Sequence, residues 1–130
     1  MNKRLVEIGS RKFTEVLCLD KPGAGGACHE YQVMRAPEHS PSPPVPGLAL
    51  EGLYAYVKFQ KGSVAENGVN GCHQEDLLAI VIDRLQHFQK GDYASRENAL
   101  ALTKVEEAMH WLNHRTAARQ ARGVEGTSEK

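Results

Sequence analysis

The spacing of apolar residues changes halfway along this chain of 130 residues. Over residues 53–60, apolar and polar side chains alternate, which is the pattern of a strand with one buried face. Over residues 73–89, apolar side chains recur at spacings of three and four, which is the pattern of a helix with one apolar stripe. This change of period predicts strands in the first half of the chain and helices in the second.

The first half holds two further strand candidates and two loops. Residues 13–19 and 31–35 contain β-branched and aromatic side chains, which favour strands. Residues 22–27 hold three glycines and a proline, and residues 37–46 hold five of the six prolines, so both predict loops. A proline-recognition motif is the alternative for the second loop. Residues 1–66 therefore predict a small antiparallel sheet of about three strands.

The second half predicts two helices joined by a short loop. Gly91 ends the first helix, and Ser95 is a suitable N-cap for the second, with Glu97 in its first turn. An apolar stripe then continues the second helix to about Arg122. We expect an antiparallel hairpin over residues 67–122, a frayed tail over residues 123–130, and an α+β fold forming one compact domain.

Charge and composition exclude several classes of protein. The 16 basic residues balance 16 acidic ones, so the chain lacks the net field of a non-specific DNA-coating protein or a binder of anionic membranes. It has no apolar run of about 18 residues, and its first residues do not resemble a secretory signal. We expect a cytoplasmic protein with no nucleic-acid or membrane partner, whose three scattered cysteines stay reduced.

Arginines at the end of the second helix form the most informative polar pattern. Arg115, Arg119 and Arg122 are four and then three residues apart, so on a helix they lie along one stripe. The simpler interpretation is a solvated helix end whose cations complement the dipole. The functional interpretation is phosphate binding, because guanidinium forks pair bidentately with phosphate oxygens. The spacing leaves both open.

Two residues near the interhelical loop carry similar alternatives. Phe88 either closes the apolar stripe of the first helix or presents its ring to a nucleotide base. Asn98, in the first turn of the second helix, either supports that turn or binds a base edge through its amide. Periodicity does not decide between them.

Signals for catalysis and for metal binding are weak. His110 and His114 lie one helical turn apart, but Trp111 stands where a metalloprotease helix carries its glutamate. The Cys72-His73 pair lies too far from them in sequence to complete a site. The glycine-rich loop does not match a phosphate-binding loop, and no serine or cysteine lies in a nucleophile motif. We expect no metal, no cofactor and no catalytic residue.

The second half contains several short segments in a distinctive order. They are NGVNG at 67–71, LLAIVIDRL at 77–85, SRENALALT at 95–103, EEAMHWL at 106–112, Arg115-Thr116 and RGVEGT at 122–127. In these segments the chain resembles the hairpin domain of a family of phage cyclic-nucleotide sponges, which comprises the type 1 Thoeris anti-defence proteins and the shorter anti-CBASS sponges. Over residues 1–58 the resemblance is limited to the shared plan of a small sheet ahead of the hairpin.

The resemblance implies a decoy that is not an enzyme. It would bind the glycocyclic ADP-ribose signal of the Thoeris system in the cytoplasm of the infected bacterial host, so that the effector is not activated. By position, Phe88 would stack on adenine, Asn98 would hydrogen-bond the ligand, and Arg115 and Arg119 would hold the phosphates.

The resemblance also implies an assembly and further contacts. The chain would form a homodimer, with a hexamer as the larger assembly, and cyclic di- or trinucleotides are a second ligand class. Further ligand contacts are Lys58 or Lys61 from the sheet, in place of an arginine of the family, together with Arg96 and Arg122.

Two rival functions remain. The first is a phosphodiesterase that hydrolyses a cyclic nucleotide with His110, His114 or Glu107 as acid and base. The second is a small nucleic-acid-binding module that uses Arg115, Arg119 and Arg122 on phosphates, which would make its affinity steeply salt-dependent.

Overall fold

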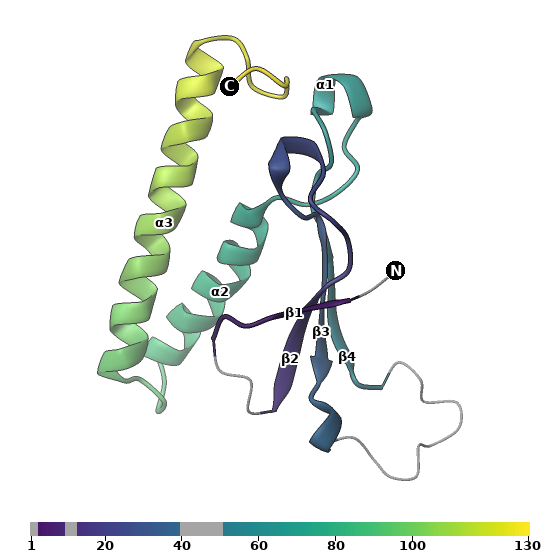
Figure 1. The fold of residues 1–130 in the computed structure, drawn as a ribbon. Coiled ribbons are helices and arrows are strands. Elements are labelled where there is room, and N and C mark those ends of the chain that lie inside the picture. Colours follow the sequence, from purple (N-terminus) through teal and green to yellow (C-terminus); the bar gives the residue numbers. More distant parts are fainter. Residues whose placement is uncertain (1–2, 10–12, 40–50) are drawn as a thin grey trace. The chain divides into compact units, whose positions relative to one another are not determined.

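The chain folds into two compact units (Figure 1). The structure is a computed structural model that describes residues 3–9, 13–39 and 51–130. One unit comprises residues 1–62 and 69–71, and the other comprises residues 63–68 and 72–130. The sequence predicts a sheet region ending at residue 66 and a separate tail from residue 123. In the structure, residues 63–68 and the tail belong to the helical unit.

The first unit is a four-stranded antiparallel sheet in the order β1-β2-β3-β4. Its strands are β1 (Arg4–Val6), β2 (Thr14–Cys18), β3 (Glu30–Arg35) and β4 (Leu53–Lys58). The α+β class and the three expected strands are confirmed. The additional strand, β1, has only three residues, which is too short to establish a period of two.

The alternation that predicted β4 is confirmed by its burial. Its apolar residues are half-buried, whereas Tyr54, Tyr56 and Lys58 are exposed. Both tyrosines make hydrogen bonds to β3: Arg35 Nε donates to the Tyr54 hydroxyl over 2.9 Å, and the Tyr56 hydroxyl donates to Glu30. Their rings therefore lie on the solvent side of the sheet with their polar ends engaged.

The connections of the sheet are irregular, as their composition predicts. The glycine-rich loop contains a 3-10 turn, η1 (Ala24–Gly26), in which Gly25 and Gly26 adopt positive φ angles of 72° and 81°. A second 3-10 turn, η2 (Pro37–His39), begins the proline-rich segment. Residues 40–50 of that segment lie outside the described residues.

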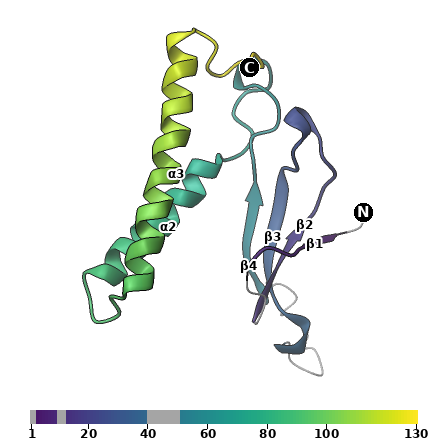
Figure 2. The ribbon, with the colours of Figure 1, turned by 60° about the vertical axis from the view of Figure 1, so that its left-hand side comes forward.

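The second unit is built on a helical hairpin that agrees with the predicted bounds. It contains a short helix α1 (Val64–Asn67), then α2 (Gln74–Gln89) and α3 (Arg96–Ala121). The Ser95 hydroxyl accepts a hydrogen bond from the backbone N–H of Asn98 over 3.0 Å, which confirms the predicted N-cap. Figures 1 and 2 show α2 and α3 side by side. Among the described residues, no helix has the length and apolarity needed to cross a membrane.

The hairpin buries its apolar stripe only partly. The half-buried residues of the stripe are Leu77, Ile82 and Leu85 on α2, and Leu102, Val105, Met109 and Leu112 on α3. Outside this stripe, Ile80 and Trp111 are each 66% exposed and Leu100 is 51% exposed. The hairpin therefore leaves several large apolar side chains uncovered.

The tail is folded, so the prediction of a frayed end is wrong. The backbone N–H of Ala65 in α1 donates to the Gly126 carbonyl over 2.7 Å, and Thr127 N–H donates to the Val124 carbonyl over 3.0 Å. The first bond joins the tail to α1, and the second closes a turn within the tail. Residues 124–127 of the tail are therefore held by hydrogen bonds within the helical unit.

Candidate functional site

A shallow recess on α2 surrounds Phe88. It has a volume of about 490 Å³, is widely open, and is lined by Ile80, Asp83, Arg84, His87 and Phe88. These residues recur at spacings of three and four, so they share one face of the helix. A recess made by one helix face holds a small ligand only when another surface covers it.

The ring of Phe88 is half-buried and one of its faces meets a cation. The Arg84 guanidinium carbon lies 4.9 Å from the ring centroid, within the range of a cation–π contact. The structure therefore gives Phe88 a position at the edge of the hairpin rather than deep in its core. A base that stacks on this ring would either displace Arg84 or lie on the opposite face.

Arg84, Asp83 and His87 are polar residues of the recess that the sequence reasoning missed. His87 Nδ1 lies 2.8 Å from the Asp83 carbonyl oxygen and 3.6 Å from its carboxylate, and both side chains are largely exposed. The spacing of four residues between Arg84 and Phe88, and between Asp83 and His87, was the available signal.

The interhelical loop brings Phe88 and Asn98 to the same end of the hairpin. The Gln89 side chain forms two hydrogen bonds with the backbone of Ser95: Nε2 donates to the carbonyl over 3.2 Å, and Oε1 accepts from the N–H over 3.1 Å. The end of α2 is thereby joined to the N-cap of α3. Because the backbone N–H of Asn98 makes the cap, its side-chain amide is not needed for that bond.

Arg115 lies far from this end of the hairpin. It follows Asn98 by 17 residues (115 minus 98) on the continuous helix α3. At about 1.5 Å per residue, this separation is about 26 Å along the helix axis. Arg115 is exposed, as is Arg122 just beyond the helix end. Within one chain, Phe88 and Asn98 do not share a small pocket with Arg115.

Arg119 is not part of an exposed stripe, which corrects the expectation of three similar guanidinium groups. Its side chain is 8% exposed, and its guanidinium donates to the carbonyls of Val124 over 2.9 Å, Thr127 over 3.1 Å, and Glu129. Its Nε also lies 3.5 Å from the Glu125 carboxylate. Arg119 thus holds the folded tail, and its predicted role toward phosphate stays a prediction.

The other predicted contacts are exposed cations in different units. Arg96 is the first residue of α3, in the helical unit. Lys58 ends β4, and Lys61 follows it in the sheet unit, where its backbone N–H donates to Asn70 Oδ1 over 2.7 Å. Their roles toward a ligand stay predictions.

The histidine pair on α3 packs around a tryptophan. The rings of His110 and His114 lie 5.6 Å and 5.7 Å from the ring of Trp111, both in edge-to-face orientation. Among the described residues, neither this pair nor Cys72-His73 belongs to a group of three metal-ligating side chains.

Comparison with known proteins identifies the hairpin. The family model described as "Acb2/Tad1, hairpin domain" matches residues 52–117, which is just over half of the chain. A curated relative, "Thoeris anti-defense 1" of Bacillus phage SBSphiJ7, is 60% identical over 79 residues. The match covers 61% of this chain and 56% of the relative, so the chain spans little more than half the length of that protein.

The family match includes most of the predicted ligand-binding residues of the hairpin. Phe88, Asn98 and Arg115 lie within residues 52–117, whereas Arg119 lies two residues beyond them. Because the family model matches more than half of the chain, the chain belongs to the family with the Acb2/Tad1 hairpin domain.

Proposed function

We propose that the chain is a phage anti-defence sponge that binds a glycocyclic ADP-ribose signal and holds it intact. It would act in the cytoplasm of the infected bacterial host, where removal of the signal leaves the Thoeris effector inactive. Membership of the Acb2/Tad1 hairpin family and the name of the curated relative support the anti-defence role. The presence of Phe88, Asn98 and Arg115 within the matched segment supports the ligand class.

The main support for a pocket shared between two chains is the separation of about 26 Å along α3 between Asn98 and Arg115. A single nucleotide-sized ligand that contacts both must receive them from two chains. Antiparallel crossing of two copies of α3 would bring Arg115 of one copy toward Asn98 of the other. Two-fold symmetry would then create two equal pockets.

Exposed apolar side chains provide the surface for such a dimer. Leu100 and Trp111 are eleven residues apart and share a face of α3 with Arg115, and both are more than half exposed. Their burial against a second copy would remove apolar surface from water at about 25 cal/mol per Å². The dimer is the unit that the pocket requires, and a hexamer of three such dimers is the larger assembly we propose.

The residues offer the interactions that a cyclic ADP-ribose needs. Its two phosphates carry charges that the Arg115 guanidinium can bind bidentately, with Arg122 as the neighbouring exposed cation. Phe88 would contribute base stacking of about 1–3 kcal/mol. Sequestration at nanomolar concentration requires about −12 kcal/mol, so the pocket must be largely formed before the ligand arrives.

Calorimetry with purified glycocyclic ADP-ribose tests the binding. We expect a stoichiometry of one ligand per chain and a loss of affinity in Phe88→Ala and Arg115→Ala. Heat denaturation of the complex, followed by mass spectrometry, should return the ligand unchanged. Recovery of a cleaved product would refute the sponge and support the phosphodiesterase, in which case His110→Ala and His114→Ala should stop turnover.

A panel of ligands separates the remaining alternatives. Cyclic di- and trinucleotides test the second ligand class, with Arg96→Ala as the variant for a separate site. Single-stranded DNA tests the nucleic-acid module, whose affinity would fall steeply with salt and would not depend on Phe88. Tight binding of DNA without binding of the cyclic signal would contradict the proposal.

A further inference from the structure

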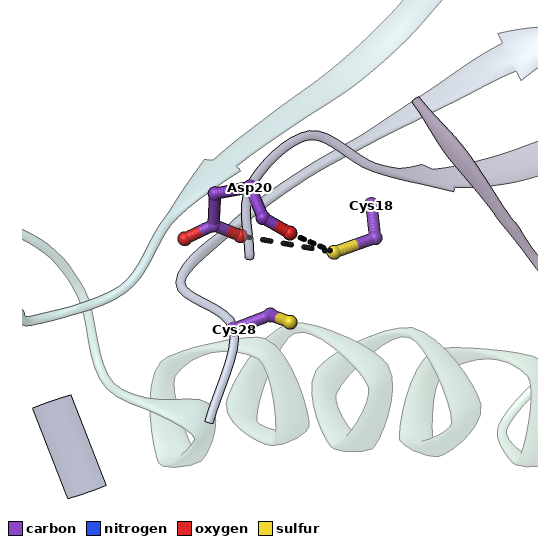
Figure 3. A group of neighbouring side chains, drawn as sticks. All are labelled: Cys18, Asp20 and Cys28. Atoms are coloured by element: carbon purple, nitrogen blue, oxygen red, sulfur yellow. Dashed lines mark hydrogen bonds between the residues drawn. The ribbon is translucent and has the colours of Figure 1, made fainter. Parts of the chain in front are cut away.

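Three potential metal-ligating side chains converge at one end of the sheet (Figure 3). Cys18 ends β2, Asp20 follows it by two residues, and Cys28 lies in the loop that leads into β3. One donor atom from each lies within 4.8 Å of the other two. The Cys18 sulfur is 3.7 Å from Asp20 Oδ1. These residues are in the sheet unit, whereas the proposed ligand-binding residues Phe88, Asn98 and Arg115 are in the helical unit.

The backbone holds this cluster in place without any ligand. The Asp20 carboxylate accepts hydrogen bonds from the backbone N–H groups of His29, at 2.9 Å and 3.1 Å, and of Glu30, at 3.2 Å. Leu19 N–H donates to the Glu30 carbonyl over 2.8 Å, which extends the β2–β3 pairing. The donors are therefore positioned by a closed loop, and binding a cation would require little ordering.

The spacing of the donors suits a small tetrahedral cation. Zinc lies about 2.3 Å from a thiolate sulfur and about 2.0–2.2 Å from a carboxylate oxygen, so tetrahedral ligands are about 3.5–3.8 Å apart. The distance of 3.7 Å from the Cys18 sulfur to Asp20 Oδ1 falls in this range. The other separations among the donors of Cys18, Asp20 and Cys28 are all within 4.8 Å, and His29 is outside this group, so its ring would have to turn to reach the same cation.

A second observation comes from His29. Its side chain is 8% exposed, and its Nδ1 atom is buried without a hydrogen-bond partner among the described residues. That atom lies 3.9 Å from Asp20 Oδ2, whereas the Cys18 sulfur lies near the other carboxylate oxygen, Oδ1. A buried imidazole nitrogen without a partner is unfavourable, and a cation would satisfy it.

The charges of the cluster also favour a divalent cation. In the free chain the Cys18 thiol donates a hydrogen bond to the Asp20 carboxylate, and a bound cation would replace that proton and the proton of Cys28. The two thiolates and the Asp20 carboxylate would then carry three negative charges. Arg4 lies beside them, with its guanidinium Nη2 4.0 Å from the Cys28 sulfur. Arg4 and one divalent cation together supply three positive charges. The complete site would therefore be neutral, as a partly buried cluster requires.

We propose that Cys18, Asp20 and Cys28 bind one thiophilic divalent cation of the zinc class, and that His29 completes the site after rotation of its side chain. Two sulfur donors select such a cation over magnesium or calcium, which prefer oxygen ligands. The bound cation would tie the end of β2 to the loop before β3 and stabilise the sheet unit. This structural role goes beyond capture of a cyclic nucleotide.

Cobalt titration of the full chain, reduced and stripped of metal with a chelator, tests the site. Cobalt in a tetrahedral thiolate site gives visible absorption bands and a sulfur-to-metal charge-transfer band. We expect one cobalt per chain, displacement by zinc, and a zinc-dependent rise in the melting temperature. Cys28→Ser should weaken binding at least about tenfold, and His29→Ala should weaken it measurably. Cys72→Ser, which removes a cysteine outside the cluster, should leave binding unchanged.

The variants separate loss of the site from loss of the fold. Cys18 is fully buried, so Cys28→Ser, at a half-buried position, is the primary test. Circular dichroism should give the same spectrum for Cys28→Ser and the wild type. Absence of the tetrahedral bands in the reduced wild-type chain would overturn the proposal, as would equal cobalt affinity in Cys28→Ser. Binding of glycocyclic ADP-ribose is measured separately, so either proposal can fail without the other.

Discussion

Replacing Arg119 with alanine tests whether this residue holds the fold or faces a ligand. The guanidinium is nearly buried and donates to three carbonyls of the tail, those of Val124, Thr127 and Glu129. The two bonds of ordinary length, at roughly 1.5 kcal/mol each for a charged donor, contribute about 3 kcal/mol. The ion pair with Glu125 adds little, because that carboxylate is 37% exposed.

We therefore expect Arg119→Ala to lower the free energy of unfolding by about 3 kcal/mol. Urea denaturation measures this change, and hydrogen exchange should give faster exchange at the Thr127 N–H, whose acceptor lies in the same tail. Arg115→Ala is the matched control, because it removes an exposed guanidinium from the same helix and should change stability by less than about 0.5 kcal/mol. If Arg119→Ala had the stability of the wild type, the tail would not depend on this side chain and our reasoning would be refuted.

Three further predictions concern the ligand, the turn before α2 and the sheet. Phe88→Ala should weaken binding of glycocyclic ADP-ribose by about 5- to 150-fold, which is the contribution of one stacked base, with little change in the melting temperature. An unchanged affinity measured by calorimetry would exclude stacking. Gly71→Ala should destabilise the fold by at least about 1–3 kcal/mol in urea denaturation, because a Cβ there would overlap the backbone of Lys58 and Phe59; wild-type stability would contradict this close approach. The hydrogen bond to Glu30, and to a lesser extent burial, raises the pKa of Tyr56. The neutral phenol therefore stabilises the fold below a pH of about 10, the pKa of an unfolded tyrosine. This contribution to stability is lost as the pH rises through the pKa of Tyr56 in the folded state. Glu30→Gln should shift tyrosinate absorbance to lower pH, and an unchanged titration would rule out this coupling.

Local chemistry explains why the hairpin could be predicted closely. The spacing of apolar residues defines α2, and Ser95 defines the start of α3 through a hydrogen bond between residues three positions apart. Both signals are contained in a few neighbouring residues, so they can be read from the sequence. The same holds for β4, whose alternation appears directly in its burial.

Contacts between distant residues explain what was missed. The strand β1 has three residues and acquires its structure by pairing with β2. Arg119 has the same spacing as Arg115 and Arg122, but the tail folds back and accepts its hydrogen bonds. No periodicity indicates where a tail of eight residues will return, so a buried structural arginine was grouped with exposed ones.

The sequence predicted some residues of the candidate site, but not those whose positions depend on contacts that leave no sequence pattern. Phe88 lies in a recess and Asn98 lies at the same end of the hairpin, because Gln89 bonds to Ser95. Arg84, which covers the ring of Phe88, was missed because one guanidinium on a helix surface is not distinctive in sequence. The cluster of Cys18, Asp20 and Cys28 depends on strand pairing and loop closure, which join residues that share no spacing motif.

Mixing two variants with weakened binding tests most directly whether the ligand pocket is shared between two chains. Phe88→Ala and Arg115→Ala are each expected to bind the cyclic signal weakly. In a mixed two-fold dimer, one pocket carries both substitutions and the other carries neither. With random exchange, half of the dimers are mixed, so we predict that tight binding returns to about one quarter of the pockets. If the mixture bound no better than the separate variants after subunit exchange, with mixed dimers confirmed by native mass spectrometry, the shared pocket would be contradicted.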